Sequence, residues 1–216
     1  AAINHPRFQL QPLTNDQDDI EALALNILGL GLAFGLFLMM LHIKPDYIEA
    51  WNRRATIYYM KKDFDDSLAE FELALRLNRN MSLAQGLYGL VLSSFGRWKE
   101  GGDAARRALR LSPRGPLTAI YNGFVAYAEF VGCNYDEAIR QARESVRQRV
   151  DFAGAHRILT AAAGMAGETE IARAALRELR RVQPDISLAW LAEQLPIKLD
   201  AERDHYLEGF RRAGLK

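Results

Sequence analysis

Apolar, aromatic and small side chains recur along this chain at a fixed spacing. The turn-like segment around Pro45 is matched four more times, at Arg79, Pro113, Val150 and Pro184. Three of the four steps measure 34 residues, and the step from Pro113 to Val150 measures 37. A repeat of this length holds two helices and two turns, and stacked repeats share a continuous core. The pattern predicts an all-α chain of antiparallel helix pairs, with the three extra residues near Arg114-Gly115-Pro116.

The identities within the repeat are as regular as its length. Aromatic and small residues of the first repeat stand at its positions 4, 8, 11, 20, 24 and 27, as Trp51, Ala55, Tyr58, Ser67, Phe71 and Ala74. Small residues let two helices approach closely, and aromatic residues fill the gaps between neighbouring pairs. Over residues 18–194 the chain therefore resembles the tetratricopeptide repeat family. The resemblance implies an α-solenoid, a right-handed superhelix of helix pairs that binds other protein segments.

The sequence after Pro184 predicts how the solenoid ends. Ile186–Gln194 is expected to form one more helix, which Leu195-Pro196 stops. Asp200–Ala213 is then expected to form an amphipathic capping helix over the last apolar surface. Its buried face would carry Tyr206, Leu207 and Phe210. The division predicted from these signals is an N-terminal extension (1–17), a degenerate leading repeat (18–45), four repeats plus an extra helix (46–194) and the capping helix (195–216).

Glycines mark the turn inside three of the repeats. Gly96, Gly132 and Gly167 fall where a left-handed residue ends a helix, so each is expected to adopt that conformation.

An unusually apolar stretch precedes the repeats. No polar side chain occurs from Ile27 to Leu41, and extension to Ala22 adds only Asn26. Three interpretations remain open. The stretch can be a buried leading repeat with a turn at Gly29 and Gly31, a self-association face that makes a homodimer, or a membrane-spanning helix from Ala22 to Leu41.

Composition narrows the function classes. The formal net charge is +1, which gives no case for nucleic-acid binding. The single cysteine, Cys133, excludes an internal disulfide and fits a reducing compartment. Together these favour a cytoplasmic location, with a solenoid anchored to the inner membrane as the alternative. No metal-binding or catalytic motif occurs, so neither a cofactor nor enzymatic activity is expected.

The inward positions of the first-type helices predict a binding groove. Its candidate residues are Asn52, Thr56, Tyr59, Met60, Leu90, Tyr127, Phe130, Val131, Arg157 and Met165. This surface is mainly apolar, which suits an apolar or amphipathic segment. The alternative is that the chain's own N-terminal segment fills it. The lysine–asparagine clamp of chaperone-binding family members is absent, because Asn52, Thr56 and Leu87 stand at three of its positions.

A narrower resemblance covers residues 80–216. Gly86-Leu-Tyr-Gly-Leu, Ala108-Leu-Arg-Leu-Ser-Pro and the closing Tyr206-Leu-Glu-Gly-Phe-Arg-Arg-Ala-Gly-Leu resemble the tails of bacterial class III adenylate/guanylate cyclases. In those proteins a catalytic domain precedes the repeats, and no strand-rich segment of that kind occurs here. The resemblance implies a regulatory or interaction module.

Overall fold

The computed structural model describes residues 17–43 and 48–216, with side chains at residue 29 and from residue 31 onward within those ranges. The described residues form eleven helices and no strand. In chain order the helices are α1 (Gln17–Ile43), α2 (Ile48–Met60), α3 (Phe64–Leu77), α4 (Ser82–Ser94), α5 (Trp98–Leu111), α6 (Thr118–Val131), α7 (Tyr135–Gln148), α8 (Ala153–Ala166), α9 (Thr169–Val182), α10 (Leu188–Gln194) and α11 (Asp200–Ala213).

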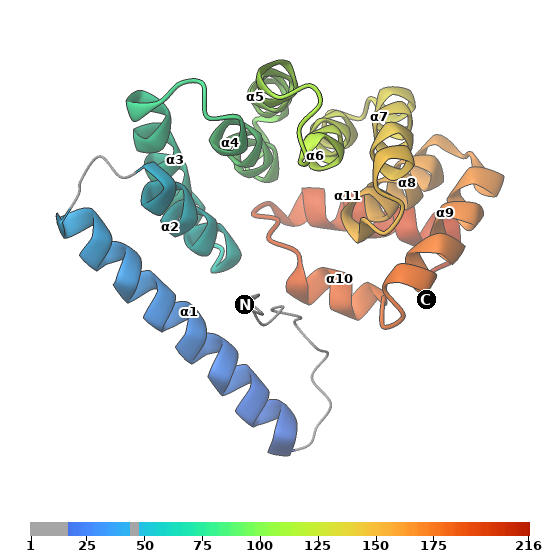
Figure 1. Ribbon diagram of the computed structural model, residues 1–216. Coiled ribbons are helices and arrows are strands. Elements are labelled where there is room, and N and C mark those ends of the chain that lie inside the picture. The colour runs from blue at the N-terminus through green and yellow to red at the C-terminus, as the bar shows by residue number, and fades with distance from the viewer. Residues whose placement is uncertain (1–16, 44–47) are drawn as a thin grey trace, which may run out of the picture.

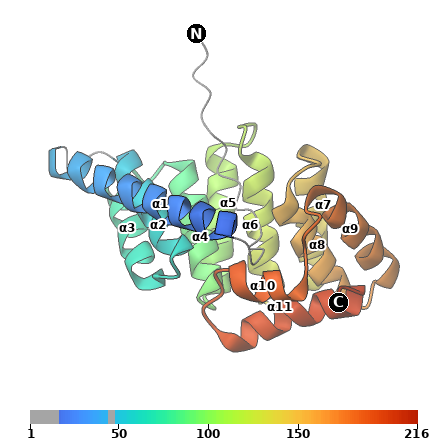
Figure 2. The ribbon, with the colours of Figure 1, turned by 90° about the horizontal axis from the view of Figure 1, so that it is seen from below.

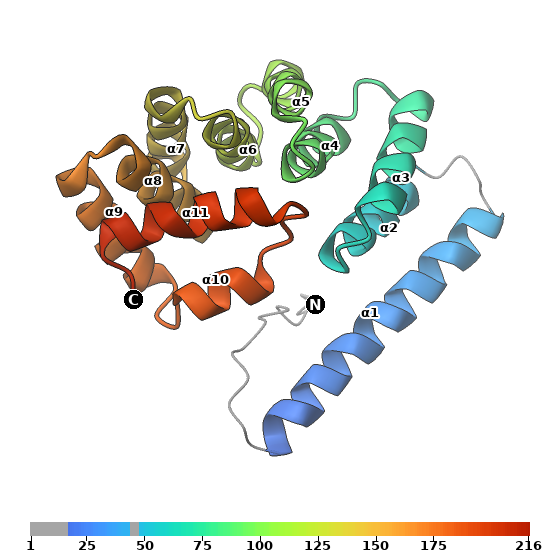
Figure 3. The same ribbon diagram turned by 180° about the vertical axis from the view of Figure 1, so that it is seen from behind.

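The helices from α2 to α9 form four antiparallel pairs that stack into an arch (Figure 1). This confirms the predicted all-α solenoid. In these four pairs, α2, α4, α6 and α8 line the inner side of the arch, and α3, α5, α7 and α9 form its outer side. The view from behind shows the same arrangement (Figure 3). The longer step in the repeat falls partly in the loop 112–117 between α5 and α6, which is longer than the loops 78–81 and 149–152.

Small residues bring the helices of a pair together. A Cβ added to Gly89 would lie 2.5 Å from the carbonyl oxygen of Gly101, so α4 and α5 nearly touch at this crossing. Serines of other helix pairs donate hydrogen bonds to backbone carbonyls. Ser67 Oγ donates to the Ala55 carbonyl at 2.8 Å, and Ser145 Oγ donates to the Ala119 carbonyl at 2.6 Å. Both hydroxyls are buried, and a buried polar group needs such a partner.

The turn glycines agree with the prediction at two positions and differ at the third. Gly96 and Gly167 have φ values of 80° and 78° and end their helices in the left-handed conformation. Gly132 has a φ of −75°, and Cys133 adopts the left-handed conformation in its place, with a φ of 59°. Gly132 instead allows close packing, because a Cβ there would lie 2.7 Å from the Trp98 ring.

The N-terminal helix α1 is single and unbroken. It passes through Gly29 and Gly31, so the turn considered at these two residues does not form. Phe34 packs edge-on against Tyr58 of α2, with 5.2 Å between ring centroids. Leu41 is buried as well, whereas Figures 1 and 3 place the N-terminal part of α1 apart from the arch. Several of its large side chains are exposed, among them Leu32, Leu36, Met39 and Ile43.

The C-terminal helix buries the residues predicted for it and packs on the last repeat from inside the arch. Tyr206, Leu207 and Phe210 are buried, as expected. α11 packs mainly on α8 and also contacts α9, and it lies inside the curve of the arch beside α6 (Figures 1 and 2). Its position is fixed by glycines and aromatic rings of the inner surface, which pack closely against α11.

Candidate binding site on the inner face

Glycines hold α11 close to α8. A Cβ added to Gly209 would lie 2.5 Å from the Ala161 carbonyl oxygen and 2.8 Å from its Cα. A Cβ added to Gly164 would collide with the backbone of Gly209 in the same way. These are backbone-to-backbone approaches that only glycine permits. Two inward positions of the fourth repeat, Ala161 and Gly164, are therefore occupied by the chain itself.

An aromatic cluster joins α11 to α6. The Tyr206 ring meets the Phe130 ring edge-on at 5.2 Å and the Tyr127 ring at 6.3 Å between centroids. His205 stacks on Phe130 at 4.7 Å, and its Nε2 lies 2.8 Å from the Tyr135 hydroxyl. Burial lowers the pKa of His205, which favours the neutral form of the stacked imidazole. Here the C-terminal helix fills this part of the groove in cis. Residues 1–16 of the N-terminal segment, the other candidate for this role, lie outside the described residues.

The segment between α10 and α11 reaches back to the first repeats. The Lys198 backbone N–H donates to the Ser94 carbonyl at 3.2 Å, and the Lys198 ammonium lies 3.8 Å from the Phe95 ring centroid. The same ammonium pairs with Asp65 at 3.3 Å. Residues 195–199 thus form a strap that crosses the inner face from α8 to the end of α4.

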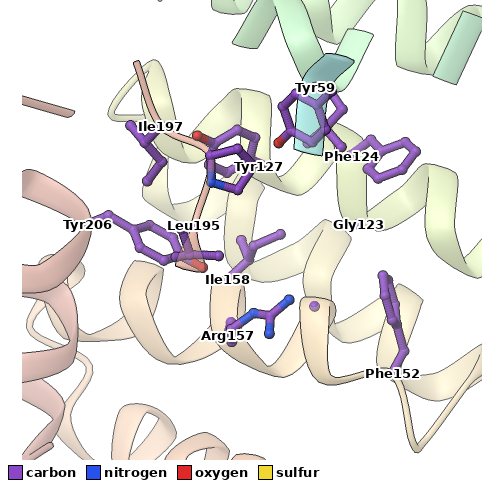
Figure 4. Close-up of a pocket in the computed structure, with 13 residues that line it drawn as sticks. Tyr59, Gly123, Phe124, Tyr127, Phe152, Arg157, Ile158, Leu195, Ile197 and Tyr206 are labelled. Carbon is purple, nitrogen blue, oxygen red and sulfur yellow. The ribbon is translucent and has the colours of Figure 1, made fainter. Parts of the chain in front are cut away.

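A pocket of about 260 Å³ lies between this strap and the inner helices. Its lining is Tyr59, Leu90, Gly123, Phe124, Tyr127, Phe152, Gly154, Arg157, Ile158, Leu195, Pro196, Ile197 and Tyr206. Figure 4 shows these side chains converging from α2, α6, α8 and the strap. The walls are aromatic and aliphatic, and Arg157 supplies the one ionic group among these lining residues.

The three pocket tyrosines are uncharged at neutral pH. Burial raises the pKa of Tyr59 to about 12, and burial also raises the pKa values of Tyr127 and Tyr206 well above the usual value for tyrosine. The positive charge of Arg157 acts on the pKa values of Tyr59 and Tyr206 in the opposite direction, because the guanidinium lies near both rings. The Tyr59 hydroxyl lies 3.2 Å from Ser94 Oγ. The pocket therefore combines neutral, apolar walls with one fixed positive charge.

The structure separates the predicted groove residues into three groups. Tyr59, Leu90, Tyr127 and Arg157 come together in the pocket. Phe130, Val131 and Met165 pack in the core that α11 completes. On α2, the Asn52 side chain is buried, Thr56 Oγ1 donates to the Asn52 carbonyl at 2.8 Å, and Met60 is 48% exposed.

Sequence reasoning missed the pocket residues that lie outside the inward repeat positions. Phe124 and Phe152 come from the repeats, whereas Leu195, Ile197 and Tyr206 come from the C-terminal segment. The sequence contained a signal for the strap. Leu195-Pro196-Ile197 is an apolar run between two helices, and an apolar loop is more stable when it packs against the rest of the protein.

Glu202 makes the docking of α11 sensitive to pH. Its carboxyl group lies against the Gly96 turn, and its Oε2 atom is buried without a hydrogen-bond partner among the described residues. Burial raises its pKa from 4.5 to about 7. The protonated form is favoured in the fold, so its stabilising contribution is complete below pH 4.5, falls as pH rises, and is lost above about pH 7.

We expect Glu202→Gln to remove this pH dependence. The variant should be more stable than the parent at pH 8 and equal to it near pH 4, as measured by urea unfolding. Glu208→Gln is the control, because a hydrogen bond from Arg212 lowers the pKa of Glu208 and its pH dependence has the opposite sign. An equal change in stability of Glu202→Gln at both pH values would contradict the role assigned to the carboxyl group.

Comparison with known proteins agrees with this geometry. A family model described as "Tetratricopeptide repeat" matches residues 48–81, which contain α2, α3 and the following loop. The chain has the tetratricopeptide repeat fold. A stretch of 86 residues is 34% identical to the peroxisomal targeting signal receptor of Saccharomyces cerevisiae; it covers 35% of this chain and 14% of that receptor.

Solved structures superimpose over most of the chain. PilW, described as a widely conserved type IV pilus biogenesis factor, has a TM-score of 0.69 at 20% identity, covering 93% of this chain and 90% of PilW. MamA of Desulfovibrio magneticus RS-1 has a TM-score of 0.60 at 13% identity, covering 77% of this chain and 93% of that one. YrrB, described as a TPR protein with an unusual peptide-binding site, has a TM-score of 0.54 at 15% identity, covering 82% of this chain and 90% of YrrB.

Membrane-spanning helices and metal sites are absent from the described part of the chain. No helix there combines the length and the apolar character needed to cross a bilayer. No group of three or more His, Cys, Asp or Glu side chains among the same residues is arranged to hold a metal ion.

Proposed function

We propose that this tetratricopeptide solenoid is a non-catalytic interaction scaffold that binds an apolar protein segment in its inner-face pocket. The supporting observation is the pocket itself, which joins four predicted groove residues to the strap. Its volume of about 260 Å³ lies just below the ~300–1,000 Å³ typical of small-molecule sites. That space suits one or two large side chains of a bound segment.

Filling the pocket should abolish binding without disturbing the fold. Leu90 lines the pocket from α4 and is only partly buried, so a tryptophan at this position can extend into the empty space. We expect Leu90→Trp to lower peptide affinity at least tenfold while the helical circular dichroism and the melting temperature stay near those of the parent. A random peptide library displayed within a carrier loop supplies the probes. Equal enrichment of the same peptides by the parent and the variant would remove the pocket from the proposal.

The exposed face of α1 supports a second element of this proposal, self-association through Ile27–Leu41. Leu32 and Met39 are 69% and 62% exposed, although both are large and apolar. A face of this kind marks an interaction surface. Sedimentation at increasing protein concentration tests it, because a homodimer gives a rising apparent mass and a monomer does not.

The alternative is a membrane-anchored assembly factor, in line with the description of PilW; partition of the chain between buffer and detergent decides that alternative.

A finer proposal follows from the sequence resemblance over residues 80–216, namely that the module regulates a nucleotide cyclase. Addition of the purified chain to a class III cyclase catalytic domain should then change the rate of cyclic nucleotide formation. An unchanged rate, together with no binding, would count against this proposal and leave the scaffold role intact.

A further inference from the structure

The pocket contains an arginine, Arg157, that forms no ion pair within the described part of the chain. Its Nη1 donates to Gln183 Oε1 at 3.0 Å, and the guanidinium lies 5.5 Å from the Trp190 ring centroid. A guanidinium has five N–H donors, and this one uses a single donor on a neutral amide. The remaining donors can bind a ligand.

Some arginines on the outer surface do form ion pairs. Arg140 pairs with Glu137 at 2.6 Å, Arg147 pairs with Glu144 at 2.6 Å, and both contacts lie within one turn of α7. These side chains are exposed, and such pairs stabilise a helix only weakly. Arg157, by contrast, is partly buried among aromatic rings. A partly desolvated charge without a counter-ion is unfavourable by itself and is stabilised by a carboxylate.

Apolar residues continue along α4 beyond the pocket residue Leu90. Leu83 and Leu87 are partly buried on the inner side of α4, and Met60 is exposed at the end of α2. A bound segment can therefore continue past the pocket and need not end in it. α11 occupies the inner face of the last repeat, so among the described residues the segment can continue toward the first repeats.

We propose that the pocket recognises an internal segment in which a large apolar side chain is adjacent to an aspartate or glutamate. The apolar side chain enters the space between Leu90, Phe124 and Ile158, and the carboxylate accepts hydrogen bonds from Arg157. This inference rests on the proposed function, since it specifies which segment the same pocket binds. It follows from the combination of neutral walls with one uncompensated positive charge.

Matched peptides test the charge. Peptides enriched from the loop library are synthesised with acetylated and amidated ends, each in a glutamate form and a glutamine form. On the parent protein we expect the glutamate form to bind roughly ten- to a hundredfold more tightly, as for a hydrogen bond between two charged groups. Fluorescence anisotropy measures both affinities.

Variants of Arg157 assign the preference to this residue. With Arg157→Gln the two forms should bind equally, and Arg157→Lys should retain a reduced preference because it keeps the charge. Arg177→Gln removes the same charge from the exposed side of α9 and should leave the preference unchanged. Unfolding curves show whether each variant keeps the parent fold.

Failure of this inference differs from failure of the proposed function. If apolar peptides bind the parent but not Leu90→Trp, and yet glutamate and glutamine forms bind alike, the inference is overturned and the binding pocket stands. The inference is also overturned if Arg157→Gln keeps the glutamate preference, or if binding requires a free C-terminal carboxylate. If no peptide distinguishes the parent from Leu90→Trp, the proposed function itself fails.

Discussion

Replacing Gly209 by valine is expected to detach α11 from the inner face. The new side chain would meet the carbonyl oxygen and Cα of Ala161, and neither backbone atom can move aside by a rotamer change. Overpacking of this kind lowers the free energy of unfolding by about 1–3 kcal/mol. Because the new side chain meets backbone atoms, we expect a loss of about 3 kcal/mol or more. Release of α11 would uncover the aromatic cluster and free the strap.

Three measurements check this result together. Urea unfolding gives the loss of stability, binding of a hydrophobic dye reports the uncovered cluster, and limited trypsin digestion reports cleavage after Lys198 in the strap. Gly35→Val is the matched control, because a Cβ at Gly35 of α1 meets no atom within 4 Å. A Gly209→Val protein that unfolds within about 0.5 kcal/mol of the parent and resists cleavage would show that α11 does not require this close contact.

Truncation of Phe130 is expected to have an effect of similar size. Its ring is 1% exposed and touches Tyr206, His205 and Tyr135, so Phe130→Ala leaves a cavity between α6 and α11. Substitutions of this type cost about 3–5 kcal/mol. Phe130→Leu keeps most of the volume and should cost less than about 1.5 kcal/mol.

Urea unfolding of the two variants distinguishes a core residue from a binding residue. If Phe130→Ala loses less than about 1 kcal/mol while peptide affinity falls, Phe130 belongs to the binding surface, as the sequence pattern predicted. If stability falls by several kcal/mol, its position under α11 accounts for the loss. A binding assay alone cannot separate these outcomes, and for this reason Leu90, at the pocket edge, is the better residue for testing function.

The sequence was sufficient to predict the repeats because their period and their residue identities carry the same information. Gly89 and Gly101 stand at the positions where paired helices must touch, and the structure brings them together. The bounds of α11 also follow from its apolar face and from Gly214, which ends the helix with a φ of 94°. These features depend on local spacing, which one sequence displays directly.

The location of α11 could not be predicted in the same way. An amphipathic pattern tells which face of a helix is buried but not which surface covers it. Here the choice depends on Gly209 meeting Gly164, two residues of distant helices whose fit is visible only in three dimensions. The binding site in the structure therefore differs from the predicted one. Phe130 and Met165 pack in the core, and Tyr206 and the strap line the pocket.

The strap also alters how the whole chain should fold. In an ordinary solenoid each repeat contacts only its neighbours, and unfolding can proceed from either end one repeat at a time. Here Lys62 Nζ donates to the Glu193 carbonyl across 131 positions, and Lys198 reaches Asp65 across 133. Contacts so distant in sequence slow folding, because a long loop must close before they form. They also connect the first repeat to the last helices, so we expect the arch to unfold as one cooperative unit.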